Sequence, residues 1–378
     1  MILTALYFAL CVFLYYKFMA WTEGSVYESD LPAHISLAVD DGLIYSLISL
    51  IIIGLSKSGT LMILPVILAM FALLSVFFSA QLIIEVSDEK IDPNVAILFA
   101  LLLNLVMPCY IKGLSAGRYM GMHAASIWHN STYLMMKWLG LWTILAYLKV
   151  EKHISEKLTL ESYTAFTILL TITTAAKPNF FLAVTPVMFI FLIMDLAGRK
   201  APAKKLLFFA SSVIPSVAVM MFQNRALFNA GAGGNGIELA PGRAMSAHTG
   251  YLIPVCILSI AFPLMVLVLH IKEIFKDKNM LFAWLCAGCG FMQYFLFSEK
   301  GSRNMDANFS WGYAFTIILI FGISLIIWFK DMMNFKNDKS VIRKVYLALC
   351  GIVLAYHSYC GILFFARLCM GVSYMMWG

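Results

Sequence analysis

Long apolar runs separated by short polar segments extend along the whole chain of 378 residues. Runs near or above the roughly 18–20 residues needed to cross a bilayer recur from end to end, for example at 2–20, 60–86 and 341–369. They are too long and too uniform for barrel strands, and in lipid a helix satisfies its own backbone amides. The pattern therefore predicts an all-α fold, a polytopic transmembrane helical bundle that forms a single domain over 1–378.

Composition agrees with this class and excludes others. Hydrophobic residues make up 62% of the chain and charged residues 12%, about half the charged fraction of a soluble domain. The net charge of +7 sits mostly in short loops between apolar runs, where basic residues set orientation, so no nucleic-acid partner is expected. The run 1–20 lacks a small-residue cleavage site and is predicted to stay as the first helix. Cys286 and Cys289 have redox spacing but are interpreted as helix packing.

The basic segments predict which loops share a side of the membrane. Strongly basic residues fall in 149–157, 198–205, 270–278 and 330–344, and such loops are typically cytoplasmic. Four polar segments then fall outside, namely 23–41, 111–130, 223–250 and 298–310. Any chemistry is therefore expected on the non-cytoplasmic side.

The number of spans depends on the first polar segment. The run 43–53 has only 11 residues, about 16 Å of helix, which is too short to cross. We therefore predict a first outer loop over 21–56 with interfacial or re-entrant helices. This gives about eleven spans, within a range of ten to twelve, with the N-terminus inside and the C-terminus outside. The segment 223–250, with its glycines at 231–236, is predicted as a flexible outer loop, and 298–310 as a further outer loop.

The first outer loop carries an acidic and a basic group four residues apart, Asp30 and His34. A helix beginning near Pro32 places both close to one face. Asp30 could act as a general base or a metal ligand. Alternatively, it caps a surface helix, with His34 at the membrane interface.

Two later segments carry groups suited to an anion. Trp128-His129-Asn130-Ser131 precedes an apolar run and has the character of a helix start, whose free amides favour phosphate. Lys177 lies in a tight outer turn, against the usual bias of lysine toward the cytoplasm. Either a phosphate partner or ordinary interfacial placement explains it.

The last outer segment is dense in hydrogen-bonding groups, with aromatic residues behind them. Arg303 offers a bidentate fork for phosphate, while Asn308 and Trp311 suit sugar hydroxyls and sugar faces, and Glu299 lies close by in the sequence. A solvated loop with an aromatic belt remains the alternative interpretation.

These blocks resemble a known superfamily. Glu28-Ser-Asp30-Leu-Pro-Ala-His34 is similar to the acidic first-loop signature of GT-C-type membrane glycosyltransferases. The blocks Trp128–Tyr133, Lys177-Pro-Asn179 and Asn308–Gly312 resemble segments of its bacterial branch that uses polyprenyl-phosphate sugars. The resemblance implies a GT-C-like bundle that takes a polyprenyl-phosphate-sugar donor from the bilayer and transfers the sugar to a glycan or lipid-linked acceptor.

Residue roles also follow from the resemblance. Asp30 would be the catalytic base, with His34 and His129 orienting it or binding donor phosphate. The phosphate would meet Lys177 and Arg303, with Arg118 as a third cation. The remaining donor contacts would come from Asn130, Glu299, Asn308 and Trp311. A divalent ion, Mg²⁺ or Mn²⁺, stays open, with Asp30 as its ligand if one is used.

The resemblance also places the protein in the bacterial cytoplasmic (inner) membrane, with its active face outside. Other functions remain open. A lipid-linked glycan polymerase would use the same fold, a sugar acyltransferase would use His34 as its base, and a flippase or transporter of lipid-linked sugars would need no catalytic base.

Overall fold

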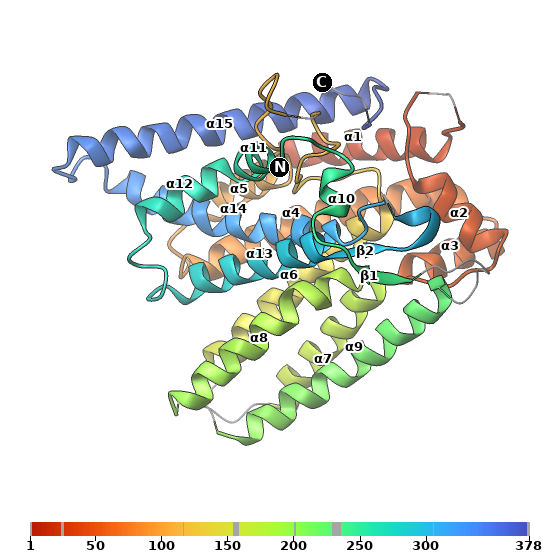
Figure 1. The fold of residues 1–378 in the computed structure, drawn as a ribbon, viewed down its shortest axis with the longest axis horizontal. Helices are drawn as coiled ribbons and strands as arrows, with labels where there is room; N and C mark the ends of the chain where they lie inside the picture. Colours follow the sequence, from red (N-terminus) through yellow and green to blue (C-terminus); the bar gives the residue numbers. More distant parts are fainter. Residues whose placement is uncertain are drawn as a thin grey trace.

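The computed structural model describes residues 2–23, 26–115, 117–153, 159–199, 202–228, 236–304 and 306–375. Its long helices form one bundle (Figure 1). The elements, in chain order, are α1 (Ile2–Met19), α2 (Leu31–Val39), α3 (Leu47–Lys57), η1 (Leu61–Ile63), α4 (Leu64–Val86), α5 (Pro93–Leu103), α6 (Ser131–Lys152), α7 (Leu160–Ala176), α8 (Asn179–Ala197), α9 (Lys204–Phe228), β1 (Ile237–Leu239), α10 (Arg243–Ser246), α11 (Leu252–Ser259), α12 (Ala261–Leu269), α13 (Lys278–Leu296), β2 (Phe297–Glu299), η2 (Gly301–Arg303), α14 (Ser310–Met333) and α15 (Val341–Cys369).

Helix α14 lies at the centre of the bundle. Every residue from Trp311 to Ile326 is buried, because α14 packs against α13, α12, α8 and α4 on its different sides. Helices α7, α8 and α9 form a group along one side (Figure 1), with α9 packed chiefly on α7. A helix that is apolar all round and fully enclosed by others is typical of the middle of a membrane bundle.

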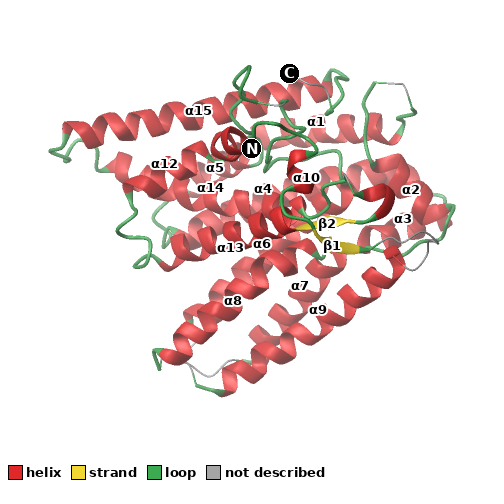
Figure 2. Ribbon diagram, viewed as in Figure 1, coloured by secondary structure: helices red, strands yellow, loops and turns green. Residues whose placement is uncertain are grey.

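A two-stranded antiparallel ribbon joins two of the polar segments. β1 pairs with β2 so that Ile237 lies opposite Glu299 and Leu239 lies opposite Phe297 (Figure 2). Each strand has only three residues, too few for a period-two pattern to stand out in the sequence. The ribbon holds the segment after α9 against the segment before α14, at the end of the bundle where α2 and α3 also lie (Figure 1).

The region predicted as the first outer loop, 21–56, contains the short helix α2 and all but the last residue of α3, and the two helices pack against each other. They have 9 and 11 residues, so each is too short to cross a bilayer. The segment 223–250 is more ordered than a loop where it is described, because it contains the end of α9, strand β1 and helix α10. Most of its glycine run falls at 229–235, outside the described residues.

The expected count of about eleven spans is wrong. Among the described residues, seven helices are long and apolar enough to cross a membrane, or eight if α11 and α12, which meet at a 73° bend, form one broken span. The sequence count also included α5, α6 and α7. However, α5 has 11 residues and α7 has 17, which is too short. Helix α6 is long enough but less apolar, because it begins with Ser131, Thr132 and Tyr133 and carries Lys137 near its middle. The protein is a helical membrane protein with seven to eight candidate spans.

A buried histidine bridges two chain breaks inside the bundle. His357 of α15 donates from Nδ1 to the carbonyl of Met107, which follows α5, over 2.7 Å. Its Nε2 accepts the backbone N–H of Phe262, at the start of α12, over 3.4 Å. These contacts satisfy backbone groups that a helix break leaves without intrahelical partners, which explains how non-helical backbone is tolerated there.

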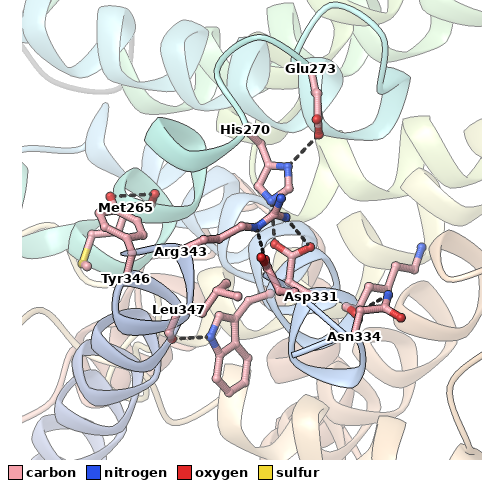
Figure 3. Close-up of polar contacts among 11 residues, drawn as sticks. Met265, His270, Glu273, Asp331, Asn334, Arg343, Tyr346 and Leu347 are labelled. Atoms are coloured by element: carbon pink, nitrogen blue, oxygen red, sulfur yellow. Dashed lines mark hydrogen bonds and ion pairs between the residues drawn. The ribbon is translucent and has the colours of Figure 1, made fainter. Parts of the chain in front are cut away.

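Charged residues of the predicted cytoplasmic segments meet at the other end of the molecule. His270, after α12, contacts Glu273 at 2.7 Å and Asp331 of α14 at 2.8 Å. Arg343 of α15 contacts Asp331 at 3.0 Å and Asp338 at 3.3 Å. We call these five residues the ion-pair cluster; Figure 3 labels His270, Glu273, Asp331 and Arg343. The hydrogen bond to Asp331 raises the pKa of His270. Through Asp331, the contacts of His270 and Arg343 connect the end of α12 with α14 and α15.

Candidate functional site

One large cavity, of about 1220 Å³, opens among the polar segments. Side chains from all four of them line it, together with Lys177 of the turn between α7 and α8 and Tyr374 beyond α15. Helices α6, α8 and α14 all begin at its wall, because Asn130, Asn179 and Ser310 lie at their first residues or caps. Three positive helix ends therefore point toward this cavity, which favours an anionic ligand.

Asp30 stands at the cavity wall with both carboxylate oxygens engaged. Its Oδ2 accepts a hydrogen bond from Asn130 Nδ2 over 2.9 Å, and its Oδ1 accepts one from the Tyr374 hydroxyl over 3.2 Å. Asp30 precedes α2 but makes no side-chain capping bond. Ser29 Oγ accepts the Leu31 amide instead, over 3.1 Å. The capping interpretation of the Asp30 carboxylate is therefore wrong, and the carboxylate is available to the cavity.

His34 lies one turn along α2 and reaches the beginning of α6. Its Nδ1 is 2.7 Å from the Ser131 hydroxyl. Burial lowers the pKa of His34 to about 4, so its ring is neutral at pH 7. A neutral imidazole beside a hydroxyl is able to accept a proton from it.

His129 is enclosed by aromatic rings. Tyr374 stacks on it with ring centroids 3.8 Å apart and planes within 2°, and the Tyr119 hydroxyl lies 3.4 Å from its Nε2. Burial lowers the pKa of His129 to about 4 as well. The ring is thus held in one orientation beside Asp30 rather than exposed as a free ligand.

The environment of Asp30 keeps it ionised. Burial by itself favours the neutral acid, but His129, His34 and the hydrogen bonds from Asn130 and Tyr374 outweigh it and lower the pKa of Asp30. The two imidazoles contribute because, with pKa values of about 4, they become charged in the acidic range where Asp30 takes up its proton. At pH 7 the cavity wall therefore presents a carboxylate between two neutral rings.

Lys177 contacts the Asn130 amide at the end opposite to the one that contacts Asp30. Its Nζ donates to Thr132 Oγ1 over 2.7 Å and to Asn130 Oδ1 over 3.5 Å, and it lies 4.5 Å from the centre of the Trp311 ring. Burial lowers the pKa of Lys177 to about 7. Asn130 thus separates the carboxylate from the ammonium, with one end of its amide bonded to each.

The last polar segment forms a second chain of contacts along the wall. Trp311 Nε1 donates to Asn308 Oδ1 over 3.1 Å, and Asn308 Nδ2 donates to Glu299 Oε2 over 2.8 Å. Arg303 pairs with Glu299 at 3.2 Å and with Asp306 at 3.1 Å. Burial raises the pKa of Glu299. These residues line the cavity, so the chain continues from Lys177 through Trp311 to Arg303.

Nine of the ten residues singled out in the sequence line this cavity. The exception is Arg118, whose guanidinium stacks on Tyr110 at 4.3 Å. Within the described ranges, no group of three or more His, Cys, Asp or Glu side chains could hold a metal ion. Sequence reasoning missed Tyr119, His123 and Tyr374, all of which line the cavity. His123 and Tyr119 lie in a polar segment already singled out, but Tyr374 has no local signal.

Comparison with protein families and with curated proteins finds no match to this chain.

Proposed function

We propose that the protein is a membrane glycosyltransferase that takes its sugar from a polyprenyl-phosphate donor, with Asp30 as the general base. One observation carries this proposal: the Asp30 carboxylate and the Lys177 amine face one cavity from the two ends of the Asn130 amide. Transfer from a sugar phosphate to a hydroxyl requires a base for the acceptor and a cation for the leaving phosphate.

In the proposed reaction, Asp30 accepts the proton of the acceptor hydroxyl as its oxygen attacks the anomeric carbon. The bond from that carbon to the phosphate oxygen breaks, and the phosphate leaves with the electron pair, which inverts the anomeric centre. Lys177 would stabilise the departing charge, together with Arg303 and the positive ends of α6, α8 and α14. The rings of His34 and His129, neutral at pH 7, lie close to Asp30 and do not compete with it for the acceptor's proton in this scheme.

Two further parts of the cavity fit this substrate. Asn308 and Glu299 present hydrogen-bonding groups for sugar hydroxyls, and Lys177 lies over Trp311, so we assign that ring to positioning the cation. Leu37 of α2 and Met220, Met221 and Leu227 of α9 add an apolar stretch to the wall. Met221 is 56% exposed, so this stretch reaches the surface, and we assign it to the isoprenoid chain.

Sugar transfer by the purified protein tests the proposal. The protein is supplied with radiolabelled polyprenyl-phosphate sugars and membrane acceptors, beside Asp30→Asn and Lys112→Gln, an exposed lysine used as a control. We expect transfer to fall at least about a hundredfold in Asp30→Asn, the range usual for loss of a general base, and to persist in Lys112→Gln. Full activity of Asp30→Asn rejects the assignment.

Additional arms of the same assay separate the neighbouring functions. A chelator added to the wild type shows whether Mg²⁺ or Mn²⁺ is required. Products longer by many sugars indicate a glycan polymerase. Donor binding without transfer, unchanged in Asp30→Asn, favours a flippase or transporter.

Acyl transfer to a sugar is the second candidate, and the contact of His34 with Ser131 favours it. A hydroxyl 2.7 Å from a neutral imidazole, at the start of a helix, has the arrangement of a nucleophile beside its base. Ser131→Ala separates the two functions. It removes the nucleophile, so acyl transfer would be lost, whereas glycosyl transfer through Asp30 is expected to change by less than about tenfold.

A further inference from the structure

The segment that follows α15 folds back over the first polar segment. Tyr27 donates its hydroxyl to the carbonyl of Cys369 over 3.1 Å, and the Ser373 hydroxyl donates to the carboxylate of Glu28. Gly371 turns the chain with φ +85°, a conformation that side chains rarely adopt, and a Cβ there would press on the Tyr27 ring. These contacts fix residues 370–375 against the loop that carries Asp30.

This fold-back brings Tyr374 to the wall of the cavity. Its hydroxyl donates to Asp30 Oδ1, its ring stacks face to face on His129, and the Tyr119 ring meets its edge at 5.7 Å. Only 7% of Tyr374 is exposed. A tyrosine this enclosed is expected to keep one rotamer, so its hydroxyl has a fixed position relative to the carboxylate.

We infer that Tyr374 is a positioning residue for Asp30, which rests on the function proposed above. Asn130 and Tyr374 donate to different oxygens of one carboxylate, so together they prevent its rotation. Lone pairs remain on both oxygens for an acceptor hydroxyl. Each donor also stabilises the ionised form over the protonated one. Tyr374 therefore holds the base both oriented and charged.

Other groups around Asp30 also affect its protonation and must stay constant in a test. From α2 it faces His34, from the segment before α6 it faces His129, and from the turn after α7 it faces Lys177. Burial raises the pKa values of Tyr45 and Tyr119, and the charge of Asp30 raises them further, so both hydroxyls lie within its electrostatic reach. Tyr374→Phe leaves these groups and the stack on His129 in place and removes only one hydroxyl.

Carbodiimide labelling measures the effect without any sugar donor. N,N′-dicyclohexylcarbodiimide reacts with protonated carboxyl groups, and the labelled peptide is identified by mass spectrometry in the full-length protein. Above the pKa of Asp30, the protonated fraction rises tenfold for each unit of increase in that pKa. Losing a hydrogen bond to a charged group shifts a pKa by about one unit. At pH 5.5 we therefore expect Asp30 to be labelled about tenfold faster in Tyr374→Phe than in the wild type.

Tyr27→Phe is the matched control, because it removes a hydroxyl that anchors the same segment without contacting Asp30. It is expected to label at the wild-type rate, and Asp30→Asn is expected to show no label at that position. Any of three results would overturn the inference. Tyr374→Phe and the wild type could label at equal rates, Asp30 could remain unlabelled in both proteins, or Tyr27→Phe could show the same acceleration.

The transfer assay adds a second measurement. Tyr374→Phe is expected to lower kcat about tenfold with little change in KM, because the lost bond orients the base rather than binding the donor. If the wild type transfers no sugar, the proposed function fails while the labelling still decides the role of Tyr374. If Tyr374→Phe keeps the wild-type kcat, the positioning role is rejected while the proposed function stands.

Discussion

At the scale of single residues, the site depends on ionisable groups whose charge is set by burial. Lys177 is the clearest case, because burial lowers its pKa to about 7 while Thr132 and Asn130 hold its amine at the cavity wall. The fraction of Lys177 that is charged therefore changes across the physiological range, and binding of an anion is expected to change with it.

This leads to a prediction about donor binding. The phosphodiester of a polyprenyl-phosphate sugar stays ionised between pH 6 and 8.5, whereas Lys177 loses its proton as the pH rises through about 7. We expect KM for the donor to increase about tenfold over this range, since the unprotonated amine gives up its charge-assisted contact. The measurement is the initial rate of sugar transfer at each pH as a function of donor concentration.

Two variants of the same residue serve as controls. Lys177→Gln is expected to show a high KM at every pH, and Lys177→Arg a KM that does not vary with pH, because arginine stays protonated. A wild-type KM that is constant from pH 6 to 8.5 would show that Lys177 does not bind the phosphate.

At the scale of helices and loops, contacts between elements hold each end of the bundle in place. The cavity end is joined by the β1–β2 ribbon and by Asn179, which donates to the carbonyl of Asn308 over 2.9 Å and so ties α8 to the segment before α14. The opposite end is joined by the ion-pair cluster of Figure 3, where α12, α14 and α15 meet around Asp331.

The ion-pair cluster predicts a pH dependence of stability. The hydrogen bond between His270 and Asp331, together with the one to Glu273, raises the pKa of His270 in the folded protein. The stabilisation is therefore complete below the ordinary histidine pKa of about 6.5 and is lost as the pH rises through the raised value. We expect His270→Gln to lower the melting midpoint by about 2 °C or more at pH 6, and by less at pH 9.

Melting of the detergent-solubilised protein measures this difference. Lys276→Gln, an exposed position in the same loop, is expected to leave the midpoint unchanged at both pH values. A destabilisation by His270→Gln that is as large at pH 9 as at pH 6 would mean that packing, rather than charge, accounts for the role of His270.

At the scale of the whole molecule, the chain separates its polar groups between two ends of an apolar bundle. The cavity gathers the segments predicted to be outside, and the ion-pair cluster lies in segments predicted to be cytoplasmic. From the positive-inside tendency we propose that the cavity faces the non-cytoplasmic side.

Thiol labelling of intact cells tests this orientation. Cysteine is introduced at Ser246, exposed in α10 at the cavity end, or at Asn337, exposed between α14 and α15. A membrane-impermeant maleimide is expected to label Ser246→Cys in intact cells, and Asn337→Cys only after permeabilisation. The wild type, with its eight native cysteines, sets the background. The reverse pattern would place the cavity in the cytoplasm.

Composition and the order of basic loops are sufficient to predict a helical membrane protein and to group the polar segments that line one cavity. This succeeds because low charge, long apolar runs and backbone pairing are requirements of the lipid itself. Because basic and non-basic loops alternate along the chain, the polar segments can be grouped at one end of the bundle even when the number of spans is misjudged. For this reason the sequence could predict that Asp30, Asn130, Lys177 and Trp311, which line one cavity, lie near one another.

Side-chain partners and helix lengths were decided by tertiary packing alone. Tyr374 meets Asp30 across 344 positions and Asn130 meets it across 100, so no spacing rule could pair them. Arg118 turns to Tyr110 instead of the cavity. The bend between α11 and α12 is accommodated because His357, from a distant helix, accepts the backbone N–H of Phe262. Such contacts depend on where helices cross, which local propensity and hydropathy do not encode.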